Sequence, residues 1–171
     1  MQAGRFDPTE TTEGYLLALA SHITQHGVPL ALYSDRHSIF TKHNDEDGVP
    51  TQFERALLQL EIEPICARSP QAKGPVERLF QTLQDRLVKA LRLAGINDLD
   101  KANAWLPGYI EQHNERFAVA PRQQAYMHRP WLGSAGQLAR ICAVHHQRQL
   151  RAQLSCRFEG QVLRKRPATP P

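Results

Sequence analysis

The sequence has none of the marks of a secreted or membrane-spanning protein. No apolar run approaches the roughly 20 residues that a helix needs to cross a bilayer, and no signal-peptide pattern opens the chain. The three cysteines, Cys66, Cys142 and Cys156, lie far apart and form neither a zinc motif nor a redox motif. These absences favour a cytoplasmic protein with reduced thiols. No internal repeat is visible, and 171 residues suffice for one domain and a small appendage.

Charge is distributed unevenly along the chain. From Gln137 to the end there are seven basic residues and one acidic residue, so this segment carries +6; the whole chain carries +4, and the rest therefore carries −2. A near-neutral body with a basic tail indicates a polyanionic partner, most simply nucleic acid. The alternative is a solvated, disordered tail. In the first case the contacts to nucleic acid are expected at Arg148, Arg151, Arg164, Lys165 and Arg166.

The first part of the sequence predicts the order helix, strand, helix, strand. The expected bounds are Glu13–His26, Pro29–Ser34, Thr51 to Glu61 and Ile62–Ala67. Thr11 or Thr12 caps the first helix and Gly27 ends it. The continuous apolar run of the first strand predicts burial on both faces, and a Thr-x-x-Glu capping box opens the second helix. Pro64 places the second strand near an edge.

A longer helix is expected from Pro75 to about Ala94, with Gly95 just past its end. Its apolar residues recur at helical spacing and predict one buried stripe, formed by Val76, Leu79, Phe80, Leu83, Leu87, Ala90, Leu91 and Ala94. Glu77 lies at the border of this stripe in the first turn, where the helix dipole favours a charged carboxylate. Such a Glu is either a metal ligand or an ordinary helix-start residue.

The remaining sequence predicts a helix over Leu99–Arg116, interrupted near Pro107-Gly108, with Trp105, Ile110 and Phe117 as packing residues. A connector from Ala120 to Pro130 follows, and Trp131 anchors it. Short strands with a Glu159-Gly160 hairpin turn and a disordered end complete the chain. Their expected ranges are Val144–Leu150, Leu154–Phe158, Gln161–Arg164 and, for the disordered end, Lys165–Pro171.

Two groups of potential metal ligands have ordinary explanations. His22 and His26 are four residues apart on one helix, but no third ligand is nearby, so they are interpreted as surface histidines. The acids of Asp45-Glu46-Asp47-Gly48 are adjacent rather than alternating, which favours a solvated loop over a calcium site.

Asp35 and Glu77 are the acids that point to chemistry. Asp35 follows the first strand, where open α/β sheets place ligand-handling groups, although it can equally cap a turn with Ser34. A strand-end Asp and a helix-start Glu on adjoining elements can converge on one divalent cation. All-oxygen ligands suit Mg²⁺ or Mn²⁺, the ions that assist phosphoryl transfer.

Two motif blocks contain these acids: Ala-Leu-Tyr-Ser-Asp-Arg-His-Ser-Ile-Phe at 31–40 and Ala-Arg-Ser-Pro-Gln-Ala-Lys-Gly-Pro-Val-Glu-Arg at 67–78. They resemble insertion-sequence transposases with a retroviral-integrase-type catalytic core. Further matches lie at Phe6–Thr12, His26–Pro29 and His113–Phe117, so the resemblance spans roughly Phe6 to Trp131. The basic C-terminal segment resembles, more weakly, the small DNA-binding barrel that often follows.

The resemblance implies an α/β fold: a partial RNase H-like integrase core over residues 1–131 that lacks its first strands, then a small basic β segment over residues 132–171. It implies a DDE site with Asp35 as the second catalytic acid and Glu77 as the third, both as ligands of Mg²⁺ or Mn²⁺. The implied partner is DNA, as transposon ends and target. Arg36, Lys73 and Arg78 would contact backbone phosphates, with solvated surface charge as the alternative.

Two departures from the family pattern matter. The first catalytic Asp of the family lies on a strand upstream of Phe6 that this sequence does not include, and Asp7 matches a later position. Gln84 stands where many relatives carry Lys or Arg for DNA. Without the first strands, Leu30–Ser34 has an unpaired edge, and unpaired buried backbone groups cost about 1–3 kcal/mol each. Self-association, or association with an upstream transposase fragment, is therefore expected.

The predicted function is metal-dependent DNA strand cleavage and transfer in transposition, by a truncated chain that is inactive alone. We expect a cytoplasmic protein of bacterial type that joins the nucleoid when bound to DNA, with no membrane partner. One alternative is a non-catalytic DNA-binding or regulatory transposase remnant that uses the basic tail. Another is a small α/β interaction domain in which both acids are caps.

Overall fold

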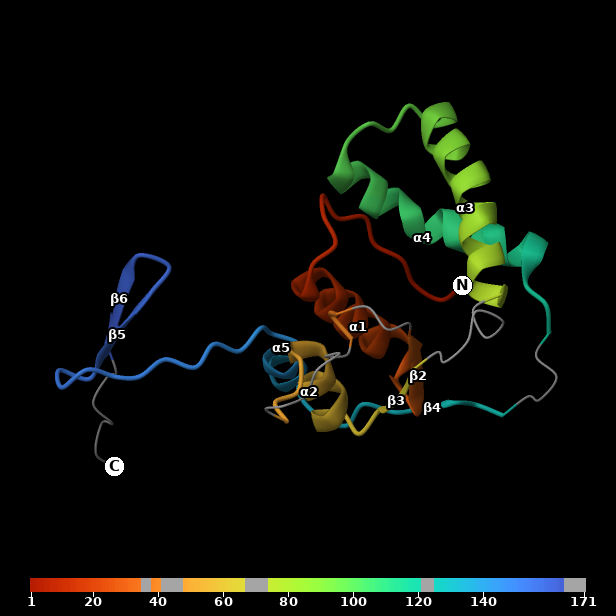
Figure 1. The fold of residues 1–171 in the computed structure, drawn as a ribbon. Coiled ribbons are helices and arrows are strands. Elements are labelled where there is room, and N and C mark those ends of the chain that lie inside the picture. Colours follow the sequence, from red (N-terminus) through yellow and green to blue (C-terminus); the bar gives the residue numbers. More distant parts are fainter. Residues whose placement is uncertain (35–37, 41–47, 67–73, 121–124, 165–171) are drawn as a thin grey trace.

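The computed structural model describes residues 1–34, 38–40, 48–66, 74–120 and 125–164 (Figure 1). Helices and strands alternate through the first half, as the sequence predicts. In chain order the elements are α1 (Thr12–His26), β1 (Val28–Pro29), β2 (Ala31–Ser34), α2 (Gln52–Gln59), β3 (Glu63–Cys66), α3 (Gly74–Leu93), α4 (Leu99–Phe117), β4 (His128–Arg129), α5 (Ala135–Ile141), β5 (Ser155–Phe158) and β6 (Gln161–Arg164). None of the helices in the described ranges has the length and hydropathy that a membrane span requires.

The hydrophobic core lies between α1, α2 and α5. The predicted cap of α1 is confirmed, because the Thr11 side chain accepts a hydrogen bond from the Gly14 amide at 3.0 Å. The predicted capping box of α2 is also confirmed: Thr51 and Glu54 each accept a hydrogen bond from the other's backbone amide. The buried apolar residues that these elements bring together are Leu16, Leu19, Ile23, Val28, Phe53, Ala56, Leu57, Leu60, Ile62, Leu138 and Cys142.

The strand predicted over Pro29–Ser34 is two strands with different partners. β2 pairs in parallel with β3, with Ala31 opposite Glu63, whereas β1 pairs antiparallel with β4. Leu30 lies at the break: its amide donates to the Met127 carbonyl and its carbonyl accepts from the Glu63 amide, each at 3.0 Å. The predicted burial on both faces is wrong, because none of the four residues of β2 is buried and Tyr33 is 46% exposed.

α3 confirms the predicted helix that carries Glu77. Gly95 ends it in the left-handed conformation, with φ of 67°, and its amide closes the last turn. The predicted burial of the apolar stripe is wrong: none of the described side chains of α3 is buried, and Val76 and Phe80 are 44% and 58% exposed. Val76 and Phe80, at the start of the helix, line a cavity that β2 also lines.

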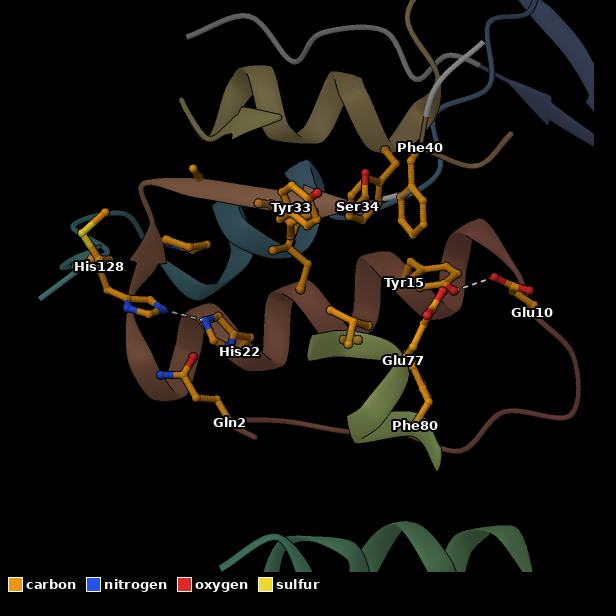
Figure 2. A pocket seen from close by; sticks show the side chains of 18 residues that line it. Gln2, Glu10, Tyr15, His22, Tyr33, Ser34, Phe40, Glu77, Phe80 and His128 are labelled. Carbon is orange, nitrogen blue, oxygen red and sulfur yellow. Dashed lines mark hydrogen bonds between the residues drawn. The ribbon is translucent and has the colours of Figure 1, made fainter. Parts of the chain in front are cut away.

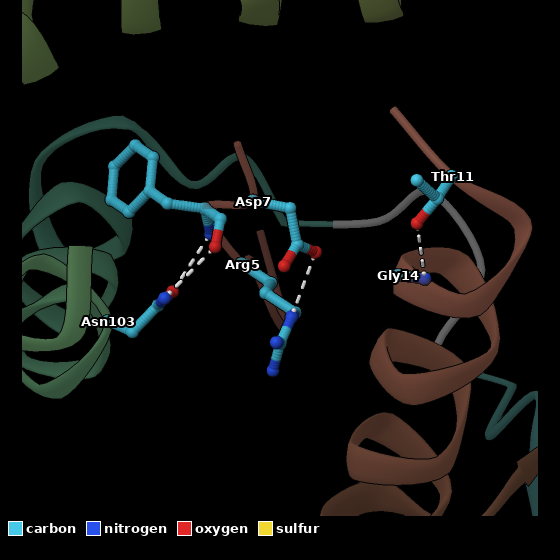
Figure 3. A network of polar contacts seen from close by, with 6 residues as sticks. Arg5, Asp7, Thr11, Gly14 and Asn103 are labelled. Atoms are coloured by element: carbon cyan, nitrogen blue, oxygen red, sulfur yellow. Dashed lines mark hydrogen bonds and ion pairs between the residues drawn. The ribbon is translucent and has the colours of Figure 1, made fainter. Parts of the chain in front are cut away.

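α4 runs through Pro107 without the predicted interruption. Packing offsets the hydrogen bond that proline removes, because the N-terminal segment lies along this helix (Figure 1). The Asn103 side chain accepts from the Phe6 amide at 2.8 Å and donates to its carbonyl at 3.0 Å (Figure 3). Ile110 is buried as predicted, whereas Phe117 is 42% exposed beneath the Arg86 guanidinium, which lies 4.8 Å from its ring centroid.

The C-terminal part differs most from the sequence prediction. β4 lies in the segment predicted as a connector, α5 has no predicted counterpart, and Val144–Leu150 forms no strand. The β5–β6 hairpin is confirmed: Glu159 and Gly160 have φ values of 47° and 78°, as a type I′ turn requires. Trp131 packs against the core, which confirms its predicted role as an anchor.

Candidate functional site

A cavity of about 880 Å³ lies between α1, β2 and the first turns of α3 (Figure 2). Its walls are mainly apolar, with Leu19 on α1, Leu32 on β2 and Phe80 on α3. Polar side chains gather toward its two ends. Figure 2 shows Glu10, Ser34 and Glu77 toward one end and Gln2, His22 and His128 toward the other.

Glu77 lines this cavity from the first turn of α3, where its side chain is exposed. Ser34, the last residue of β2, lines the same cavity and immediately precedes Asp35. The structure therefore brings the start of α3 and the carboxyl end of β2 to one cavity. Asp35 itself lies outside the described residues, so the convergence of Asp35 and Glu77 stays a prediction.

The described residues do not complete a metal site by themselves. Within the described ranges, no three His, Cys, Asp or Glu side chains are placed to hold one ion. The other carboxylate that lines the cavity, Glu10, accepts a hydrogen bond from the Tyr15 hydroxyl at 2.5 Å. A site for Mg²⁺ at this end of the cavity fits the residues only if Asp35 contributes, because this ion takes its protein ligands from oxygen atoms.

Asp7 does not line the cavity. Its carboxylate accepts a hydrogen bond from Arg5 Nε at 2.9 Å, between α4 and the start of α1 (Figure 3). Asp7 is therefore not among the acids that line the cavity with Glu77.

Four of the eight basic residues predicted to contact DNA lie within the described ranges, and all four side chains are exposed: Arg78, Arg148, Arg151 and Arg164. Arg78 follows Glu77 on α3. The Arg148 guanidinium lies 5.7 Å from the centroid of the Phe158 ring on β5, so this cation is associated with the hairpin. Outside the described residues are Arg36, Lys73, Lys165 and Arg166.

A histidine contact at the other end of the cavity has no counterpart in the sequence prediction. His22 Nε2 lies 2.9 Å from His128 Nε2, and His26 Nε2 lies 3.2 Å from the Gln2 carbonyl oxygen. Burial lowers the pKa of His22, and His128 and His26 add to the effect. His22 is thus partly buried rather than a surface residue. The signal is not local, because the β1–β4 pairing brings together residues 106 positions apart.

Sequence comparison relates this chain to transposases. Over 160 residues, or 92% of the chain, it is 44% identical to the Sinorhizobium fredii protein named "Putative transposase y4bF". Over 130 residues, or 73% of the chain, it is 38% identical to the transposase for insertion sequence IS1202 of Streptococcus pneumoniae. The chain spans only 35% and 28% of the lengths of these two relatives. No protein-family model matches the chain.

The fold is similar to that of a chain in the cryo-EM structure of the simian T-cell lymphotropic virus intasome in complex with the PP2A regulatory subunit B56 gamma. The TM-score is 0.51, over 91% of this chain and 52% of that chain, at 16% identity. At that identity the likeness concerns the fold alone. Taken together, the chain is a homologue of a portion of insertion-sequence transposases and has an integrase-like fold.

Proposed function

We propose that this chain acts in DNA transposition as the part of a DDE-type, RNase H-like core that supplies its second and third acids, Asp35 and Glu77. One observation carries the proposal. Glu77 and the end of β2, one residue before Asp35, line the same cavity in a chain that is 44% identical to y4bF. In this proposal the chain works on DNA in the bacterial cytoplasm.

The carboxylates of Asp35 and Glu77 would hold Mg²⁺ or Mn²⁺. A bound ion of this kind supplies an activated water and stabilises charge on the attacking and leaving oxygens of a phosphodiester. Glu77 lies in the first turn of α3, at the positive end of the helix dipole. Arg78, the next residue on α3, together with Arg36 and Lys73, would hold the DNA backbone beside these acids.

We further propose that residues 1–171 do not cleave DNA by themselves. The resemblance assigns the first acid of the site to a strand that has no counterpart among these residues. Asp7 does not replace it, because its carboxylate pairs with Arg5 away from the cavity. The isolated chain is expected to give no strand transfer on DNA ends with Mg²⁺, and robust activity would overturn this part of the proposal.

Grafting the chain into a complete relative tests the function. In the chimera, this chain replaces the matched region of the IS1202 transposase, and excision of an IS1202 element is measured in cells. The chimera is expected to excise the element, and Asp35→Asn or Glu77→Gln is expected to reduce excision to background. Glu63→Gln, on the exposed β3, is the matched control. Undiminished excision with Glu77→Gln would refute the role of Glu77.

Metal binding has a separate test that does not need activity. Mn²⁺ broadens the amide resonances of residues close to its ligands, so titration of the chain should broaden the signals of Ser34, Glu77 and Arg78 first. Glu77→Gln should abolish the broadening at all three. Equal broadening across the chain would show that no such site exists.

A non-catalytic DNA-binding role is the second candidate, favoured by the exposed Arg148, Arg151 and Arg164. We propose that the basic segment over residues 132–171 contacts the DNA. A deletion from Gln137 would damage the fold, because Leu138 and Cys142 pack in the core. Deletion of residues 146–171 avoids this. The logarithm of the affinity for DNA falls linearly with the logarithm of the salt concentration. If the tail contacts DNA, the deletion should make this fall less steep by several units, about 0.9 per lost phosphate contact. An unchanged slope would show that residues 146–171 do not contact the DNA phosphates.

A further inference from the structure

Three aromatic rings from different parts of the chain meet in the wall of the cavity, and we call them the aromatic cluster. Tyr15 lies near the start of α1, Phe53 lies on α2, and Phe40 lies in the described segment 38–40 between β2 and α2. All three line the cavity. Figure 2 shows Tyr15 and Phe40 at the same end of the cavity as Glu77. The cluster therefore belongs to the surroundings of the proposed site.

The rings of the aromatic cluster meet edge to face. The ring centroids of Tyr15 and Phe40 are 4.8 Å apart, with 74° between the ring planes, and those of Phe40 and Phe53 are 5.1 Å apart at 73°. This arrangement is favoured because the positive edge of one ring meets the negative face of the next. Phe53 is 3% exposed and belongs to the hydrophobic core, so the cluster is anchored there.

The hydroxyl group of Tyr15 is held as well as its ring. It donates a hydrogen bond to Glu10 Oε1 at 2.5 Å, a distance typical of a hydroxyl that donates to a carboxylate. Glu10 directly precedes Thr11, the N-cap of α1. The Tyr15 side chain is thus fixed at two points, and its ring orientation is set by both.

The aromatic cluster is close in sequence to Asp35, one of the two predicted catalytic acids. Phe40 follows Asp35 by five residues, and Ser34 precedes it directly. Ser34 ends β2, which pairs with β3, and Phe40 is held by the aromatic cluster. Residues in the cavity wall therefore stand on both sides of Asp35 in the sequence. A site keeps its geometry only if the residues that support its ligands are themselves fixed by packing.

We propose that Tyr15 is a positioning residue for cation binding at the proposed site: its ring fixes Phe40, and Phe40 in turn restrains the segment that begins at Asp35. This inference rests on the proposed function, because the cation is the one that Asp35 and Glu77 would hold. Mg²⁺ demands near-ideal octahedral geometry, so a carboxylate that is poorly restrained binds it more weakly. The ring of Tyr15 supplies the restraint, and the hydroxyl only orients the ring.

The Mn²⁺ affinity of the full 171-residue chain tests the proposal. It is obtained from the broadening of the Glu77 and Arg78 amide signals as Mn²⁺ is added. Tyr15→Leu removes the ring and is expected to weaken Mn²⁺ binding at least tenfold. Tyr15→Phe keeps the ring and removes only the hydroxyl, so it is expected to weaken binding less than threefold. Equal losses in the two variants would refute the role of the ring.

Leu16→Ala is the control for a general loss of stability. Leu16 is next to Tyr15 on α1 and is 0% exposed, but it does not line the cavity. Leu16→Ala should lower Tm more than Tyr15→Leu does, because it leaves a cavity in the core. It should nevertheless change the Mn²⁺ affinity less than twofold. An affinity that falls in step with Tm across these variants would show that Tyr15 acts through stability alone and would overturn the inference.

A double-mutant cycle tests whether Tyr15 acts through Phe40. Phe40→Leu should weaken Mn²⁺ binding by about the same factor as Tyr15→Leu, and the double variant should bind no more weakly than either single variant. Losses that multiply would mean that the two residues act independently, contrary to the proposal. Phe40→Leu also decides the question if Tyr15→Leu does not fold, because an unchanged Mn²⁺ affinity in that variant excludes the restraint.

The Glu77 variant separates this inference from the proposed function. If Glu77→Gln abolishes Mn²⁺ binding while Tyr15→Leu and Phe40→Leu leave it unchanged, only the positioning role is refuted. If the unaltered chain shows no selective broadening at Glu77, the metal site is refuted and the positioning role with it. If both leucine variants weaken Mn²⁺ binding but the IS1202 chimera is inactive, only the catalytic role is refuted.

Discussion

Gly27 affects the position of β4, the strand that carries His128 in the cavity wall. It follows α1 with φ of 88° and ψ of 178°, a combination that is essentially restricted to glycine. A Cβ added there would lie 2.6 Å from the carbonyl oxygen of Arg129 on β4. That oxygen belongs to the backbone, and Arg129 pairs with Val28, so β4 would have to move away from β1. His128, which lines the cavity, would move with it.

Gly27→Ala should therefore cost more than the backbone strain alone. Placing a side chain at these dihedral angles costs about 1–3 kcal/mol. Overpacking against β4 adds about 1–3 kcal/mol. The middle of both ranges gives a loss of about 4 kcal/mol in the free energy of unfolding. At about 2–4 °C per kcal/mol for a chain of this length, Tm should fall by about 8–16 °C.

Gly95→Ala is the matched control for Gly27→Ala. Gly95 also has a positive φ, of 67°, but a Cβ added there meets nothing within 4 Å. Its expected cost is the left-handed strain alone, about 1–2 kcal/mol. Thermal and urea unfolding followed by circular dichroism would measure both variants. If Gly27→Ala costs no more than Gly95→Ala, the contact with Arg129 does not hold and the reasoning is refuted.

Three further predictions test the core and the histidine contact. Leu16→Ala should lower the free energy of unfolding by about 2–5 kcal/mol, because Leu16 is 0% exposed. Leu17→Ala is the control and should cost far less, because Leu17 is 43% exposed. Equal costs for the two variants would contradict this packing of α1. Thr51→Ala should cost about 1 kcal/mol through loss of the α2 cap, visible as a Tm lower by about 2–4 °C. The native state lowers the pKa of His22, so the unfolded state binds more protons near pH 6, and stability should fall as pH drops below about 6.5. His22→Gln should flatten that dependence in urea titrations between pH 5 and 7, and an unchanged slope would show that His22 is not responsible.

The features that the sequence predicts correctly are local ones. The Thr11 cap, the Thr51–Glu54 capping box, the end of α3 at Gly95 and the Glu159-Gly160 turn each depend on a few consecutive residues. The chemistry of such residues fixes hydrogen bonds within one turn of the chain, whatever packs around them. The placement of Glu77 at the start of a helix belongs to this group.

The features that the sequence misses depend on distant parts of the chain. β4 forms only because the segment near His128 lies beside β1, and the His22–His128 contact follows from that pairing. Two residues of strand carry no periodicity that a sequence could display. The candidate site lies between these two groups of features. The order of the elements predicts that α3 and the end of β2 meet at one cavity, whereas Asp35 lies outside the described residues.

Two wrong predictions of burial meet at the cavity. The apolar run of β2 and the apolar stripe of α3 both predict buried side chains. In the structure, Tyr33, Val76 and Phe80 are exposed where these two elements line the cavity. The rest of the α3 stripe, away from the cavity, is not buried either. Hydrophobic spacing shows which face of a helix or strand is apolar, but whether that face is covered depends on distant parts of the chain.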